Sequence, residues 1–415
     1  MTDLSQEKQD TMIRKVFEGI KIADFTWVGA GPMTTKYFAD HGAQVIRIES
    51  SAHPDLLRVS PPFKDGIPGL NRSAYCACFN NNKLGLSLNL NHPRAMEVVR
   101  RLIDWSDIVA ESFSPGVMAR WGIAYQDLTK IKPGIIMYST SQQGQTGRHS
   151  MIAAYGTQLV ALAGFTHLTG WPDRGPTGPY GPYTDAMVPP LGAAALAAAL
   201  DYRRRTGRGI HIDLSQYEAA INFLAPVILD YTVNRRVQGR EGNRSPYAAP
   251  HGIFPCKGDN RWCAIAVFTD SEWQALCNAM GNPVWTVDPR FSTLPLRKEN
   301  EDELEQRLAG WTVNYDAGEL MYQLQSAGIP AGLVENGEDI HRDPQLAHRH
   351  YLWELEHTEI GKHHYEAPPF KLSKTPAELN KPGPCLGEDT RYVCTQILGI
   401  SDQLLTELSV EGVLE

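Results

Sequence analysis

Apolar and polar positions along the first 145 residues predict strands and helices in turn. Short apolar runs, typical of buried strands, lie at 20–25, 43–49, 84–90, 107–111 and 134–139. Residues 94–105 instead place apolar side chains at 96, 98, 99, 102 and 103, the spacing of an amphipathic helix. Strands that alternate with helices in this way predict a large, doubly wound, Rossmann-like α/β domain with a parallel sheet.

The pattern changes in the second half of the chain. Residues 164–184 form a Gly- and Pro-rich segment, and irregular segments of this length are usually functional or disordered. A helix rich in Ala and Leu is predicted next, over 191–205. Beyond residue 235, a predicted hairpin followed by several helices indicates a smaller α+β domain. We therefore expect a large domain over 1–234, a small domain over 235–330 and a C-terminal segment over 331–415.

Composition narrows the class of protein. The 415-residue chain carries a formal net charge of -8, which argues against nucleic acid as a partner, because binding to phosphates needs a basic excess. Its seven cysteines are scattered and odd in number, so a disulfide framework is not expected and a reducing compartment fits. The N-terminus is polar, and the longest apolar run, 191–200, is too short to cross a bilayer. We expect a cytoplasmic protein with no membrane partner.

Several familiar site patterns are incomplete in the sequence. Gly29 and Gly31 follow the first predicted strand as in a dinucleotide-binding turn, but Thr34 occupies the position of the third glycine. A plain turn and an anion-binding turn both remain open there. The histidines between 341 and 364 lack the ordered spacing of a zinc site, so we expect no metal. The sequence has no Gly-x-Ser-x-Gly elbow, which argues against an ordinary hydrolase.

Asp185 lies between the Gly- and Pro-rich segment and the alanine-rich helix. Aspartate is favoured at helix N-caps, which is one interpretation of this position. A helix N-terminus also stabilises an ionised carboxylate. A carboxylate with its ordinary pKa of about 3.9 is ionised at neutral pH and can act as a nucleophile without a general base. Position alone favours the N-cap, but the two roles are compatible.

Short motifs spread over most of the chain carry a family resemblance. They lie at 24–26, 30–32, 41–49, 82–83, 113–118, 144–147, 206–209, 288–291, 327–331, 343–346 and 386–388. In this order and spacing they resemble the family III CoA-transferases, the group that includes formyl-CoA:oxalate CoA-transferase and carnitine CoA-transferase. The resemblance implies an enzyme that moves CoA from an acyl-CoA, with succinyl-CoA a reasonable donor, to another small carboxylic acid. It also implies a large domain built from both chain ends and two interlocked chains, either a homodimer or a heteromer.

The resemblance assigns roles to particular residues. Asp185 matches the family's nucleophilic aspartate, which forms a covalent intermediate. CoA and acyl-CoA are then substrates, and no permanently bound cofactor is expected. Loop amides near Gln143 and Gly144 are expected to stabilise the tetrahedral intermediates. The CoA contacts carry over to Gly29, Ala30, Leu88, Asn89, Leu90, Asn91, Ser112, Phe113, Arg120, Ser141, Gln142, Gln143 and Gly144.

Three alternatives remain at this stage. An acyl-CoA racemase of the same fold needs a His and Asp pair, but no His lies within 153–158. A CoA-binding subunit of a heteromeric transferase would bind CoA without forming the adduct. A nicotinamide dehydrogenase is disfavoured by the incomplete glycine turn. The residues expected to line the acyl pocket are Tyr155, His167, Trp171 and Arg174, with Arg174 or Arg148 as a partner for a second carboxylate.

Overall fold

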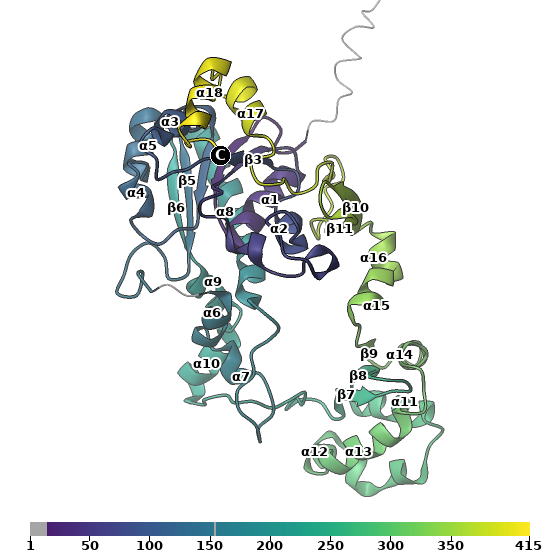
Figure 1. Ribbon diagram of the computed structural model, residues 1–415. Helices are drawn as coiled ribbons and strands as arrows, with labels where there is room; N and C mark the ends of the chain where they lie inside the picture. Colours follow the sequence, from purple (N-terminus) through teal and green to yellow (C-terminus); the bar gives the residue numbers. More distant parts are fainter. Residues whose placement is uncertain (1–14, 153–154) are drawn as a thin grey trace, which may run out of the picture. The chain divides into compact units, whose positions relative to one another are not determined.

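The computed structural model describes residues 15–152 and 155–415, and a six-stranded parallel sheet is its central element (Figure 1). The strand order is β3-β2-β1-β4-β5-β6, with neighbouring strands paired in parallel throughout. The order reverses at β1, which confirms the predicted doubly wound α/β architecture. The strands are β1 (Lys21–Phe25), β2 (Gln44–Glu49), β3 (Leu84–Ser87), β4 (Ile108–Glu111), β5 (Ile136–Ser141) and β6 (Ile210–Ser215).

Two apolar cores cover the two faces of this sheet. On one face α1 (Ala30–Asp40) and α8 (Tyr183–Thr206) pack against the strands, with Phe38 and Leu196 fully buried. On the other face lie α3 (Ala95–Trp105) and α5 (Tyr125–Ile131). The apolar positions predicted for the helix over 94–105 point into this second core, because Val98, Val99, Leu102 and Ile103 are all fully buried.

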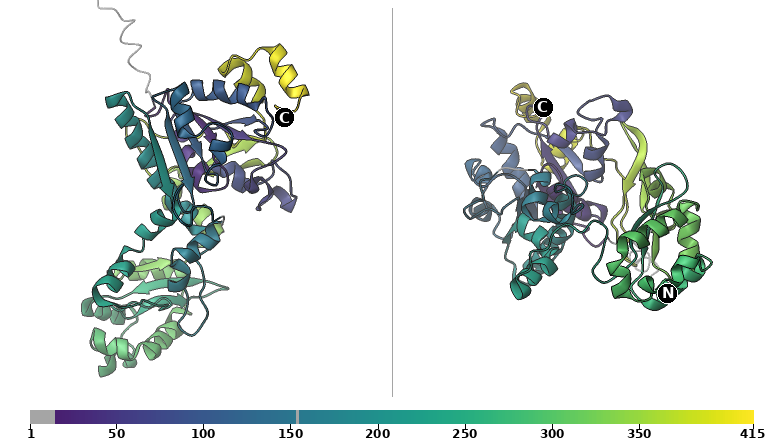
Figure 2. Two further views of the ribbon diagram at one scale, coloured as in Figure 1. Left: turned by 90° about the vertical axis from the view of Figure 1, so that its left-hand side faces the viewer. Right: turned by 90° about the horizontal axis from the view of Figure 1, so that it is seen from below.

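The C-terminal segment completes the second core. Helices α17 (Thr390–Tyr392) and α18 (Asp402–Val410), with the turn η5 (Val393–Ile397) between them, lie beside α3 and β3 (Figures 1 and 2). Val393, Leu408 and Val413 are fully buried among side chains of the first 140 residues. Both ends of the chain therefore build one large unit.

A smaller unit has its own sheet and core. Its antiparallel strands β7 (His251–Pro255), β8 (Trp262–Ala266) and β9 (Ala331–Leu333) pair in the order β7-β8-β9. Helices α11 (Asp270–Ala279), α13 (Glu301–Thr312) and α14 (Ala317–Ser326) bury their apolar faces against that sheet. This unit comprises residues 166–177 and 236–343, and the large unit comprises the other described residues.

These limits differ in two places from the expected division at 234/235 and 330/331. Strand β9 begins at Ala331 and pairs with β8, so the small unit extends past residue 330. Residues 166–177 also belong to it, through hydrogen bonds such as Gly242 N–H to Gly170 O at 2.9 Å. Both contacts are long-range pairings that composition does not reveal.

Helix α8 begins at Tyr183, eight residues before the predicted start at 191. In the sequence, Pro189 and Pro190 indicate a break in the helix, because proline lacks the N–H of a helical hydrogen bond. The helix nevertheless continues through both prolines. Asp185 is therefore the third residue of α8, and the N-cap position belongs to Pro182.

The remaining elements are short. Among the described residues, none of the helices combines the length and apolarity needed to span a bilayer. The other α-helices and strands are α2 (Ala74–Phe79), α4 (Val117–Arg120), α6 (Gly156–Leu162), α7 (Phe165–Leu168), α9 (Gln216–Asn222), α10 (Ala225–Asn234), α12 (Leu294–Glu299), α15 (Gly337–Arg342), α16 (Pro344–His348), β10 (Leu352–His357) and β11 (Gly361–Glu366). The 3₁₀ turns are η1 (Leu56–Val59), η2 (Lys64–Gly66), η3 (Val284–Val287) and η4 (Pro289–Phe291).

Candidate active site

The Asp185 carboxylate lies against two glycines from other helices. A Cβ at Gly29, the N-cap of α1, would lie 3.0 Å from Asp185 Oδ2. A Cβ at Gly156, the first residue of α6, would lie 2.8 Å from Asp185 Oδ1. Each carboxylate oxygen therefore faces bare backbone at the start of a helix, and only residues without a side chain fit there.

Two opposing effects act on the charge of Asp185. The N-terminal turns of α1 and α8 favour a negative charge, because the first amides of a helix carry partial positive charge. Burial acts in the other direction and raises the pKa of Asp185 to about 6. The expectation of an ordinary aspartate pKa was therefore wrong, because the depth of a side chain is set by tertiary packing. At neutral pH the carboxylate is still mostly ionised.

A cavity of about 570 Å³ opens beside Asp185 at the carboxyl ends of the strands. It brings Asp185 together with six of the residues predicted for the CoA site: Gly29, Ala30, Ser112, Phe113, Ser141 and Gln142. Ligands of doubly wound folds bind at this edge, near the point where the strand order reverses. The prediction missed the other lining residues, which are Trp27, Val28, Gly31, Ser114, Pro115, Ser150, Ile152, Gly156, Gln158 and Gln216, whereas Tyr155 had been placed in the acyl pocket.

The remaining predicted CoA contacts lie outside this cavity lining. Residues 88–91 follow β3 at the edge of the sheet, and the C-terminus holds them through Asn89 N–H to Val413 O at 2.9 Å. Arg120 is exposed at the end of α4. Gln143 and Gly144 continue the loop from the lining residue Gln142. Their contacts with CoA stay predictions.

The turn between β1 and α1 is held by a buried carboxylate that the sequence did not reveal. Val28 has a backbone φ of +65°, which is a strained conformation for a β-branched residue. Its N–H donates to both oxygens of Asp55, at 3.2 and 3.0 Å. Asp55 in turn pairs with the fully buried Arg47, which also contacts Glu49 at 2.9 Å. This contact network fixes the backbone that presents Gly29 to Asp185.

A second buried ion pair lies beneath the same turn. Lys83 Nζ is 2.9 Å from Asp24 Oδ2, and both side chains are fully buried. Thr26 and Thr35 donate hydrogen bonds to the same carboxylate, at 2.5 and 2.6 Å. Burial lowers the pKa of Lys83 to about 8, and Asp24 opposes that fall. Two motif segments, 24–26 and 82–83, thus meet in a polar cluster that supports the first βα turn.

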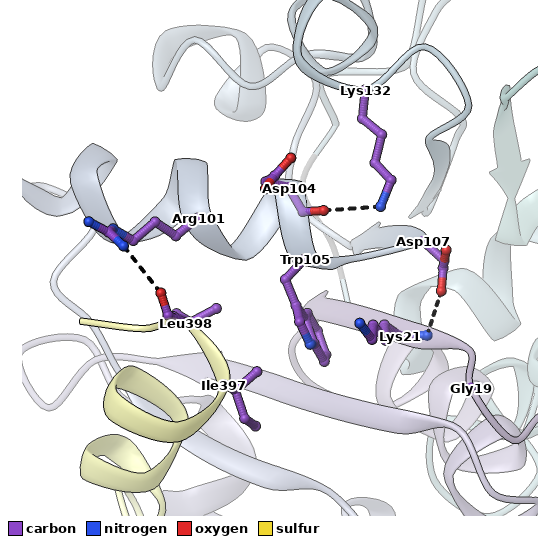
Figure 3. Close-up of a pocket in the computed structure, with 9 residues that line it drawn as sticks. All are labelled: Gly19, Lys21, Arg101, Asp104, Trp105, Asp107, Lys132, Ile397 and Leu398. Carbon is purple, nitrogen blue, oxygen red and sulfur yellow. Dashed lines mark hydrogen bonds between the residues drawn. The ribbon is translucent and has the colours of Figure 1, made fainter. Parts of the chain in front are cut away.

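Another cavity, of about 530 Å³, lies at the amino ends of the strands, next to the end of α3 (Figure 3). Two of its three cationic side chains donate to backbone carbonyls, and the third, Lys21, lies over the Trp105 ring with Nζ 5.7 Å from the ring centroid. Lys132 Nζ donates to Ser106 O at 2.6 Å and to Asp104 O at 3.0 Å, and Arg101 donates to Leu398 O at 3.3 Å. These lysine and arginine contacts close the end of α3 and attach it to the C-terminal segment, so this cavity is explained as structural.

The chain is similar to known proteins over most of its length. The family model described as CoA-transferase family III matches residues 17–390. The succinyl-CoA–D-citramalate CoA-transferase of Chloroflexus aurantiacus is 31% identical over 385 residues, covering 93% of this chain and 94% of the relative. The succinyl-CoA:glutarate CoA-transferase of Mus musculus is 29% identical over 415 residues, covering 100% of this chain and 93% of the relative. The crystal structure of a CAIB/BAIF family protein from Brucella suis superposes with a TM-score of 0.84 at 27% identity, covering 92% of this chain and 99% of that one.

Proposed function

This chain belongs to CoA-transferase family III and is an enzyme that transfers CoA between carboxylic acids, and we propose that Asp185 is its nucleophile. One observation carries the proposal. Among the described residues that line the 570 Å³ cavity, Asp185 is the one with a charged side chain. A nucleophile that is ionised at neutral pH needs no adjacent general base.

The proposed reaction proceeds by exchange of acyl groups. Asp185 attacks the thioester carbonyl, the C–S bond breaks, and an acyl-aspartyl anhydride and CoA thiolate form. The thiolate attacks the aspartyl carbonyl of the anhydride, which releases the donor acid and leaves an aspartyl-CoA thioester. The acceptor carboxylate attacks that thioester and expels thiolate again. The thiolate then attacks the acceptor's carbonyl in the resulting anhydride. This step forms the new acyl-CoA and releases the Asp185 carboxylate, so no net proton is consumed.

Backbone amides are the proposed stabilisers of the tetrahedral intermediates. The first amides of a helix lack intrahelical acceptors, and Gly29, Ala30 and Gly31 line the cavity at the start of α1. The amides of Gln143 and Gly144, for which this role was predicted from the sequence, lie one and two residues beyond the lining residue Gln142. Removing the side chain at Gln143 should slow transfer much less than changing Asp185, because a backbone donor survives the substitution.

We further propose succinyl-CoA as donor and a small carboxylic acid as acceptor. Two similar enzymes carry succinyl-CoA in their names, paired with D-citramalate and with glutarate. A racemase would need an acid and a base beside the substrate's α-carbon. The described lining of the cavity contains no histidine, so the geometry favours transfer over racemisation.

The enzyme is proposed to be a homodimer in the cytoplasm. Helix α10 has an apolar sequence, yet within the described chain it buries none of its residues. Leu229 and Val233 are 59% and 76% exposed. Exposed apolar patches of this kind mark interaction surfaces. A monomer by light scattering at micromolar concentration would contradict the dimer, and Val233→Glu should weaken the dimer.

The proposed cytoplasmic location is supported by the cysteines. All seven are unpaired, which suits a reducing compartment.

The decisive experiment is mass spectrometry of the intact protein and its peptides. Incubation with succinyl-CoA should add a hydroxylamine-sensitive acyl or CoA group to the peptide that contains Asp185. Asp185→Asn should remove the adduct and lower turnover by about 10³-fold or more. Asp201→Asn is the matched control, because Asp201 lies on the same helix but is exposed and paired with Arg204 and Arg205. An unchanged adduct in Asp185→Asn would overturn the assignment.

A further inference from the structure

Glu111 is a buried carboxylate behind the cavity, at the end of β4. Its Oε2 accepts a hydrogen bond from Phe113 N–H at 2.7 Å. Its Oε1 accepts from Gln145 Nε2 at 3.3 Å. One side chain thus binds two different loops, the one after β4 and the one after β5, and both loops contribute residues to the cavity lining.

The contact to Phe113 extends toward the nucleophile. Phe113 packs edge-on against Trp27, with ring centroids 5.6 Å apart. The Trp27 N–H donates to Ser112 Oγ at 2.9 Å, which joins the loop after β4 to the turn before α1. That turn places Gly29 against Asp185. Glu111 therefore supports the backbone around the nucleophile without touching it.

Neighbouring groups surround Glu111 on every side. On β5, Ser139 hydrogen-bonds to Glu111 and to His211 Nε2, the latter at 2.9 Å. On β6, Asp213 accepts Gln145 N–H with both oxygens, at 3.0 and 3.1 Å. The ring of Tyr125 from α5 stacks on His211, with ring centroids 5.5 Å apart. Burial raises the pKa of Tyr138 on β5, and the Glu111 charge adds to the rise. Glu111 lines a small cavity of about 100 Å³ with Ser139, His211 and Gln145.

We propose that Glu111 is a positioning residue whose ionised form ties the two loops together and so shapes the acyl-CoA pocket. The inference rests on the proposed function of that pocket. An ionised carboxylate accepts hydrogen bonds strongly on both oxygens, whereas protonation turns one of them into an O–H donor and a weaker acceptor. Protonation therefore weakens one of the two loop attachments. The loops then hold the pocket less firmly, and CoA binds less tightly.

The ionisation of Glu111 lies in the physiological range. Burial raises the pKa of Glu111 to about 7, and the Asp213 carboxylate adds to the rise, whereas the hydrogen bonds from Ser139 and Phe113 oppose it. The binding effect is therefore expected between about pH 6 and pH 8.

The test is calorimetric titration of CoA into full-length protein between pH 5.5 and 8.5. Asp185→Asn serves as the background, because it removes the titration of the nucleophile. In that background the Kd of CoA should rise as the pH falls from 8.5 to 5.5. The rise should be about five- to tenfold larger than in the double variant Asp185→Asn with Glu111→Gln. Asp185→Asn with Glu111→Gln should lack this extra dependence, because glutamine, which is close to glutamate in shape, cannot ionise.

Two further variants separate positioning from folding. Gln145→Ala removes the loop contact at a half-buried position and should weaken CoA binding at pH 8.5, with unchanged thermal unfolding. Gln126→Ala is the matched control, because within the described chain Gln126 lines the same small cavity without a hydrogen bond to Glu111. Equal pH dependence with and without Glu111 would overturn the inference while leaving the CoA pocket standing. No CoA binding in any variant would overturn both.

Discussion

The backbone of Gly156 lies so close to the Asp185 carboxylate that no side chain fits at position 156. A Cβ at position 156 would lie 2.8 Å from Asp185 Oδ1 and 2.3 Å from Pro182 Cβ. Gly156→Ala should therefore displace the nucleophile, and displacements of about 1 Å can cost about 100-fold in rate. We expect a loss of that size in adduct formation, measured by rapid quench and mass spectrometry.

A second glycine provides the control for that substitution. Gly239 has open space around its Cβ position, so Gly239→Ala should leave the rate unchanged. If Gly156→Ala acylates as fast as the unaltered enzyme, the close fit around Asp185 is not required for catalysis.

The first acyl transfer should depend on pH through Asp185. Only the carboxylate attacks, and burial raises the pKa of Asp185 to about 6. The rate should therefore be near its maximum above about pH 7 and fall about tenfold per unit well below pH 6. Single-turnover measurements at saturating succinyl-CoA separate this step from CoA binding. A rate that stays constant from pH 5 to 8 would exclude a titrating Asp185.

Folding stability should respond to Asp185 in the opposite direction from catalysis. The folded pKa of about 6 exceeds the ordinary value of 3.8, so the folded state holds the proton more tightly than the unfolded state. The stabilising contribution is thus present at low pH and is lost as the pH rises through 6. Asp185→Asn should raise the free energy of unfolding by about 3 kcal/mol at pH 8, and the gain should shrink toward pH 4. Urea titrations measure it.

The control for that stability effect is again Asp201. Hydrogen bonds from Arg204 and Arg205 lower the pKa of Asp201. Asp201→Asn should therefore destabilise slightly at pH 8 rather than stabilise. A gain in both variants would show that removing any negative charge stabilises this acidic chain, and would contradict the local explanation.

The ion pair between Asp55 and Arg47 is expected to matter for both folding and catalysis. Asp55→Ala would remove one of the two carboxylates that pair with the buried Arg47 charge. It would also remove the acceptor of the Val28 N–H. Breaking a buried ion pair costs about 3–5 kcal/mol. Denaturant titration should show a loss in that range, with slower acylation in the remaining folded protein. Asp65→Asn removes an exposed charge near Lys64, keeps a residue suited to the left-handed φ of 57°, and should change little. Equal stability of both variants would contradict the proposed support of the turn.

The sheet was predictable because its strands are continuous apolar runs. All five strands proposed in the first 145 residues are present, and α3 follows its apolar spacing. Asp185 and six of the thirteen expected CoA contacts meet at one cavity, and the family resemblance, not spacing alone, indicated them. Local pattern was therefore sufficient for these strands and for α3, and ordered motifs were needed for the site.

Long-range contacts explain what could not be predicted. Asp55 and Glu111 act through partners that the fold brings together, and no local pattern marks either residue as a support of the site. The start of α8 was missed because Pro189 and Pro190 are usually helix breakers. The raised pKa of Asp185 depends on burial by segments far away in sequence.

The use of both chain ends in one core also constrains biosynthesis. Residues up to 235 form most of the large unit, but Leu408 and Val413 fill the core on one face of its sheet. On a ribosome that adds about 5–20 residues per second, this apolar face remains incompletely covered for about 10–40 s after residue 235 is made. Exposed sheet faces of that kind are prone to aggregation, so newly made chains are expected to need chaperone protection during the interval. Expression yield would then depend on translation speed and chaperone supply as well as on the stability of the finished fold.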